Sequence, residues 1–67
     1  RAMYAVRVDS NGRTLRVYDD RGGMLFMRTM PTRIEQVTVS GNLLSVVGEQ
    51  GRLWVYELPK GGLKYTR

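Results

Sequence analysis

The amino-acid sequence predicts an all-β domain, an antiparallel meander of about seven short strands. Short runs rich in β-branched and aromatic residues alternate with Gly, Asn and Pro turn signals along the whole chain. No segment carries apolar residues at helical spacing for more than one turn. The chain also repeats itself after about 39 residues, the separation of Gly12 from Gly51. These 67 residues are expected to form one small domain.

Seven runs are predicted to be strands, and turn signals separate them. In the first run, Tyr4, Val6 and Val8 alternate with polar residues, which is typical of a half-buried strand. The runs 43–48 and 52–58 are apolar on both faces, so we expect both strands to be buried on both sides. The expected strands are residues 3–9, 14–19, 24–30, 33–40, 43–48, 52–58 and 63–67.

The turns follow from glycine, asparagine and proline. Asn11-Gly12 predicts a hairpin, because this pair adopts positive φ at low cost. Pro31 is expected to end the third strand, since proline cannot donate to a ladder. Strict alternation would place Met24, Phe26, Arg28 and Met30 together on one side of that strand. The remaining turns are expected at residues 20–23, 41–42, 50–51 and 59–62.

The composition argues against an enzyme. The chain has no cysteine and no histidine, which removes disulfides, thiolate metal sites and the commonest general base. The adjacent carboxylates of Asp19-Asp20 are better explained as a hairpin turn than as a cation or acid/base site. No cofactor is expected. The net charge of +5 favours contact with an anionic partner.

No apolar run is long enough to span a bilayer, and no signal peptide is visible. A cytoplasmic location is favoured. Arg1-Ala2, which precede Met3, are interpreted as a remnant of cloning, with Met3 as the natural start.

The second half of the chain echoes the first. The phrase "GRTLRVYDDRGGMLFMR" begins at Gly12, and "GRLWVYELPKGGLKYTR" begins at Gly51. The two copies share a glycine turn, a strand of the form Leu-x-Val-Tyr-acidic, a Gly-Gly turn and a final short strand. The equivalent residues are Val8 and Val47, Leu15 and Leu53, Arg16 and Trp54, Val17 and Val55, Tyr18 and Tyr56, Gly22 and Gly61, Phe26 and Tyr65, and Arg28 and Arg67.

Residues 34–58 resemble one blade of a β-propeller of the WD-repeat type. Tyr18-Asp19 and Tyr56-Glu57 stand where that family has its Trp-Asp pair. The resemblance implies four-stranded, propeller-blade-like sheets, one whole blade preceded by three strands of another. A propeller has about four to eight blades. Three arrangements therefore stay open: a ring assembled from several chains, a fragment of a longer protein, or a compact fold. We favour the compact fold, a small closed barrel or a two-layer meander.

The function expected from these features is protein interaction or assembly. A small sheet protein without cofactor ligands or catalytic residues is most simply an interaction module, and its edge strands can add to another sheet. A homo-oligomer or another protein is the expected partner. The second copy of the repeat is the more apolar, so we expect the contact surface to include Trp54, Tyr56, Leu58, Met24 and Met27.

The alternative is a small basic barrel that binds single-stranded nucleic acid. Such proteins stack bases on aromatic side chains within a basic groove. Tyrosine, tryptophan, arginine and lysine side chains are interleaved along the strands in this sequence. The candidate residues for this function are Arg13, Arg16, Tyr18, Arg52, Trp54, Lys64 and Tyr65.

Overall fold

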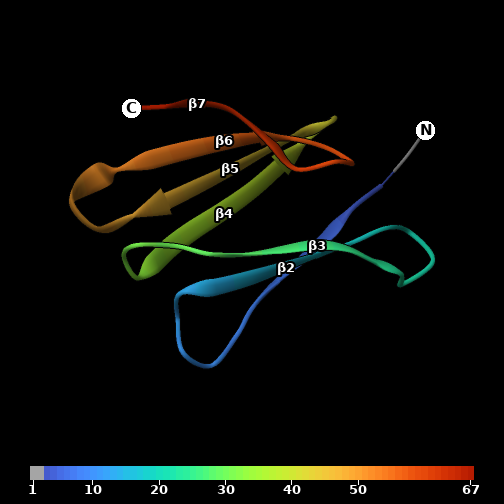
Figure 1. Cartoon of the computed structure of the whole chain (residues 1–67), viewed down its shortest axis with the longest axis horizontal. Coiled ribbons are helices and arrows are strands. Elements are labelled where there is room, and N and C mark those ends of the chain that lie inside the picture. The colour runs from blue at the N-terminus through green and yellow to red at the C-terminus, as the bar shows by residue number, and fades with distance from the viewer. Residues whose placement is uncertain (1–2) are drawn as a thin grey trace.

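The computed structural model describes residues 3–67 and contains seven strands in two antiparallel sheets (Figure 1). A three-stranded sheet has the order β1-β2-β3, and a four-stranded sheet has the order β4-β5-β6-β7. The all-β prediction is confirmed, while the interpretation of Arg1-Ala2 lies outside the described residues. The elements are β1 (Ala5–Val8), β2 (Thr14–Tyr18), β3 (Met24–Thr29), β4 (Ile34–Ser40), β5 (Leu43–Gly48), the 3-10 turn η1 (Glu49–Gly51), β6 (Leu53–Glu57) and β7 (Gly62–Thr66).

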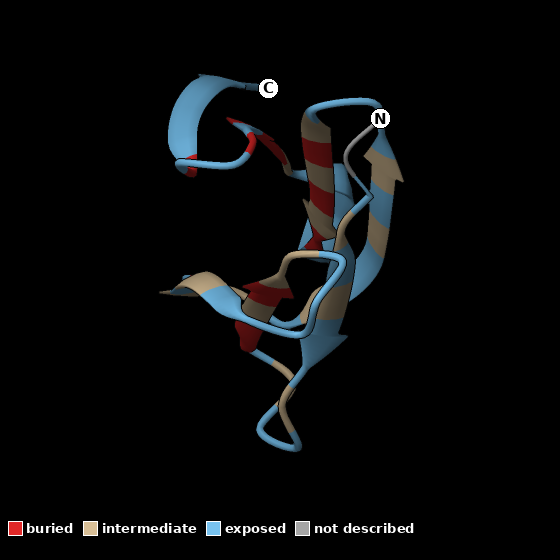
Figure 2. Cartoon of the chain, turned by 90° about the vertical axis from the view of Figure 1, so that its right-hand side faces the viewer, coloured by how far each residue is buried: buried red, intermediate tan, exposed pale blue. Residues whose placement is uncertain are grey.

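Of the two compact folds left open by the sequence, the closed barrel is excluded. The strands divide into two separate sheets, and β3 and β4 do not pair with each other. Pro31 interrupts the ladder after β3, and the chain then crosses to the other sheet over residues 31–33. Around this crossing the N–H of Met30 donates to the carbonyl of Arg13 at 2.8 Å, and that of Ile34 donates to the carbonyl of Gly12 at 2.7 Å. The two sheets pack on each other through one shared core, and Figure 2 shows the buried segments between them.

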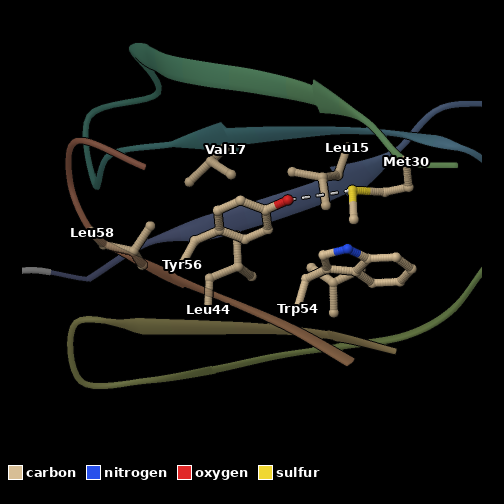
Figure 3. Close-up of a cluster of buried hydrophobic side chains, with 8 residues drawn as sticks. Leu15, Val17, Met30, Leu44, Trp54, Tyr56 and Leu58 are labelled. Carbon is tan, nitrogen blue, oxygen red and sulfur yellow. Dashed lines mark hydrogen bonds between the residues drawn. The ribbon is translucent and has the colours of Figure 1, made fainter. Parts of the chain in front are cut away.

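The hydrophobic core lies between the two sheets, where the buried residues gather (Figure 2). Side chains of alternate residues on β2, β5 and β6 point into this layer, as the pleat of a strand requires. Burying each large side chain stabilises the fold by about 1.5–3 kcal/mol. The core cluster consists of Leu15, Val17, Met30, Leu44, Val46, Trp54, Tyr56 and Leu58 (Figure 3).

The sequence repeat is also a repeat of strand register. Tyr18 pairs with Met24, and its equivalent Tyr56 pairs with Leu63. A register shift follows Val17 in one sheet and the equivalent valine in the other. The strands β1-β2-β3 thus correspond to β5-β6-β7, pair by pair.

The register shift overturns the expected arrangement of the third strand. Val17 pairs with Phe26, whereas Tyr18 pairs with Met24, so one extra residue of β3 stands between them. Such a bulge reverses the alternation of side chains. Phe26 therefore packs against the core, while Met24 lies on the opposite face of the sheet and is exposed.

No helix within residues 3–67 is long and apolar enough to cross a membrane.

Candidate interaction surfaces

Three of the residues expected at a contact surface lie in the core instead. Trp54, Tyr56 and Leu58 are at most 7% exposed, because β6 turns this face toward the three-stranded sheet (Figure 3). They hold the two sheets together and are not accessible to a partner. The Tyr56 hydroxyl donates to the sulfur of Met30 at 3.7 Å, and burial raises the pKa of Tyr56 although the charge of Arg28 opposes this shift.

An arginine links the two sheets at the edge of this core. The guanidinium carbon of Arg28 lies over the Phe26 ring, 4.8 Å from its centre, and 5.8 Å from the ring centre of Tyr56. Its Nη2 also donates to the carbonyl oxygen of Gly61 at 2.8 Å. A Cβ on Gly61 would lie 2.8 Å from the Phe26 ring, so only glycine allows this close approach. The sequence analysis did not predict this contact. The only signal was that the repeat has an arginine at both equivalent positions, Arg28 and Arg67.

The far side of the four-stranded sheet carries apolar side chains on β5, β6 and β7, whereas β4 adds the polar Gln36, Thr38 and Ser40 to the same side. Val55 pairs with Ser45 and Tyr65, and this row alternates with the core residues of the same strands. Val55 is 2% exposed, and its neighbours on this side are half-buried or exposed. We call this surface the outer apolar face; it consists of Leu43, Val47, Leu53, Val55 and Tyr65.

The far side of the three-stranded sheet is more polar. Arg16 pairs with Arg7 and Met27 there, and its Nε donates to both carboxylate oxygens of Asp9 at 3.0 and 3.1 Å. The side chains of Met24 and Met27 are exposed on this side. We call this surface the outer basic face; it consists of Arg7, Arg16, Tyr18, Met24 and Met27.

The residues expected to bind nucleic acid do not form one surface. Arg16 and Tyr18 lie on the outer basic face, whereas Tyr65 lies on the outer apolar face of the other sheet. Trp54 is buried beneath the guanidinium of Arg52, which lies 5.0 Å from its ring centre, so the indole is not a platform for a base. Two further basic residues have partners within the chain, since Arg13 donates to the carbonyl of Pro31 and Lys64 pairs with Glu57.

Two shallow hollows occupy equivalent places beside the turns that follow β2 and β6. One, of about 350 Å³, includes Glu57 and Lys60, and the other, of about 330 Å³, includes Asp19 and Asp20. In the second hollow, Asp19 Oδ1 accepts N–H groups from Arg21 and Gly23, which agrees with the prediction that this pair shapes a turn. In the described part of the chain, no group of three or more acidic residues could hold a metal ion.

Comparison of the chain with protein-family models, curated proteins and solved structures returned no match.

Proposed function

We propose that the protein is a non-enzymatic assembly module that associates with copies of itself through its sheet faces and edges. The outer apolar face carries this proposal. Apolar side chains lie on both sides of β5, β6 and β7, and a layer on each side would remove that surface from water. In residues 3–67 the three-stranded sheet covers one side of the four-stranded sheet and leaves Leu43, Val47, Leu53 and Tyr65 at the surface of the other.

The size of the protein supports the same proposal. A core of eight side chains is small, and a chain of this length buries only about 60% of the surface that its unfolded form exposes. The chain has no disulfide to compensate. Covering the outer apolar face would add burial of Leu53 and Tyr65, at about 25 cal/mol for each Å² of apolar surface.

A blade-like identity of the two sheets is part of this proposal. Each sheet is an antiparallel meander, the two stack face to face, and the same bulge occurs in both. These features agree with the resemblance to WD-type blades. Since a propeller contains about four to eight sheets, two to four chains would be needed to complete one. The free edges of β1 and β7 offer secondary contacts.

The test is the mass of the folded protein in solution. Light scattering on a sizing column, over a range of concentrations, is expected to give a mass that is a multiple of 7.7 kDa. The same run with an added oligonucleotide separates the alternative, because nucleic-acid binding would shift the elution and disappear in salt. A mass of 7.7 kDa at every concentration would contradict the proposal.

A further inference from the structure

The two outer faces repeat the two sides of the internal interface. The three-stranded sheet packs on its partner with the face that carries Leu15 and Val17, and the equivalents of these residues, Leu53 and Val55, lie on the outer apolar face. The four-stranded sheet packs with the face that carries Trp54 and Tyr56, whose equivalents Arg16 and Tyr18 lie on the outer basic face. The internal interface therefore joins two different kinds of sheet face. The outer apolar face repeats one kind, the outer basic face repeats the other, and neither is covered within residues 3–67.

The contact between Arg28 and Gly61 is the most specific part of the internal interface. The stacked pair of Arg28 and Phe26 belongs to the three-stranded sheet. The glycine turn belongs to the four-stranded sheet, where Gly61 has φ +85° and its carbonyl accepts the guanidinium N–H at 2.8 Å. The aromatic ring fits against the glycine because no side chain intervenes.

The stacked arginine and the left-handed glycine turn each occur a second time in the chain. Within residues 3–67 these second copies do not contact each other. Arg67 stacks over Tyr65 at 5.0 Å, the same arrangement as Arg28 over Phe26. Gly22 has φ +86°, close to that of Gly61, and a Cβ added there would meet no atom within 4 Å. The two glycine turns differ in length by one residue, since Gly22 donates to Asp19 and Gly61 to Glu57, but both end in the same left-handed glycine.

We infer that the outer apolar face of one chain binds the outer basic face of a second copy, with Tyr65 and Arg67 of the first seated on the Gly22 turn of the second. Arg67 then donates to the Gly22 carbonyl, as Arg28 does to Gly61 within the chain. This inference rests on the proposed function and specifies its geometry. Because the contact joins two different faces, it is heterologous, and repeated copies form a ring when the rotation between them closes.

The contact between chains is more polar than the internal one. Arg16 and Arg7 occupy the positions of Trp54 and Val46, so two guanidinium groups border the interface. Their aliphatic stems can cover apolar surface while the charged ends reach water or Asp9. The chains should therefore bind each other less tightly than the two sheets within a chain, and dissociate on dilution.

Complementary variants test the head-to-tail geometry. Tyr65→Glu damages the outer apolar face and Met27→Glu damages the outer basic face, and both positions are 40% exposed, so each variant should fold. We expect each change to raise the dissociation constant about tenfold or more, as for a residue central to an interface. Mixed in equal amounts, the two variants should form a dimer of one copy of each, because the mixture retains one intact face of each kind.

Leu63→Glu is the matched control, since Leu63 lies on the same strand as Tyr65, is 54% exposed and faces the other way. A second pair, Gly22→Ala and Gly41→Ala, compares two left-handed glycines with open space around them. Only the first should weaken association, since its new methyl group would meet Tyr65 of the next copy. The tryptophan fluorescence of every variant checks that the core is intact.

Failure of this interface and failure of self-association give different results. An assembly that persists in Tyr65→Glu, or a mixture of the two variants that forms no dimer of one copy of each, would show a different interface, such as a symmetric pairing of β1 edges. Either result would overturn the inference alone. A wild-type protein that stays at 7.7 kDa would overturn both the inference and the proposed function.

Discussion

Single residues at the centre of the core have a polar as well as an apolar role. Tyr56 packs its ring between the sheets and directs its hydroxyl to the sulfur of Met30 (Figure 3). A buried hydroxyl needs a partner, and sulfur is a weak acceptor that satisfies this need at low cost in space. Burial at this site favours the neutral phenol over the phenolate, although the charge of Arg28 opposes this preference.

The protein should therefore lose stability at alkaline pH through Tyr56. Burial raises the pKa of Tyr56 above its ordinary value of 10.0. The folded state then holds the proton more tightly than the unfolded state, so this stabilisation is complete below pH 10 and is lost as the pH rises through the folded-state pKa. The Tyr56→Phe variant should lack this loss.

Urea unfolding between pH 8 and 12 measures the effect. Above pH 10, the free energy of unfolding of the wild type should fall faster than that of Tyr56→Phe, by at most about 1.4 kcal/mol per pH unit. At neutral pH the two proteins should differ by about 1 kcal/mol or less. Tyr65→Phe, at an exposed position, is the control. If the free energy of unfolding of the wild type and of Tyr56→Phe fell equally with pH, this would contradict a raised pKa of Tyr56 in the folded state.

At the scale of elements, the equivalent strands β2 and β6 have different environments. β2 and β6 occupy equivalent positions in their sheets, and each presents a valine that is nearly inaccessible to water, Val17 and Val55. Val17 packs between the two sheets, whereas Val55 lies under its own neighbours on the outer apolar face. The equivalence of sequence therefore does not imply equal contributions to stability.

Truncating the two valines should separate these roles. In dilute solution Val17→Ala should lower the free energy of unfolding by about 2–3 kcal/mol, because two sheets enclose the cavity that remains. Val55→Ala should cost about 1 kcal/mol, because side chains on an open face can collapse onto the gap. Chemical denaturation at low protein concentration gives both values. Equal losses would show that the outer face is as rigidly packed as the core.

At the scale of the whole molecule, the two sheets depend on contacts that cross between them. The molecule measures 33 × 25 × 15 Å, and its hydrophobic core cluster lies between the two sheets. The chain crosses between the sheets at residues 31–33, next to Met30. Arg28 closes the opposite region by reaching the Gly61 turn. A single cooperative unfolding transition is expected for a domain of this size.

Replacing Arg28 should weaken the whole domain. Arg28→Lys keeps the charge but loses the planar group that both stacks on Phe26 and donates to Gly61, so we expect a loss of about 1–2 kcal/mol. Arg67→Lys changes the equivalent residue, which lies over Tyr65 and contacts no second sheet in the described chain. Its effect on unfolding in dilute solution should be below about 0.5 kcal/mol. Thermal unfolding followed by Trp54 fluorescence compares the two variants, and equal losses would contradict a bridging role for Arg28.

By itself, the sequence determined the number and type of the strands, their turns and their repeated order. These features depend on local chemistry: alternation of side chains, the permissive φ of glycine and the missing N–H of proline. The seven strands lie within one or two residues of the expected bounds. The alignment of the two copies was also visible in the sequence, and in the structure the equivalent valines and tyrosines pair in equivalent ways.

Only the tertiary structure decided which apolar face is core and which is surface. Trp54 and Leu53 are adjacent residues of one strand, and composition could not tell which side would meet the other sheet. The choice depends on how the chain crosses after Pro31 and on where the bulge in β3 reverses the side chains. Both are properties of contacts between distant residues, such as Arg28 with Gly61. For that reason the sequence alone left Trp54 and Tyr56 between a core position and a contact surface. The tertiary structure places them in the core with Leu58, and it places Leu53, Val55 and Tyr65 on the outer apolar face.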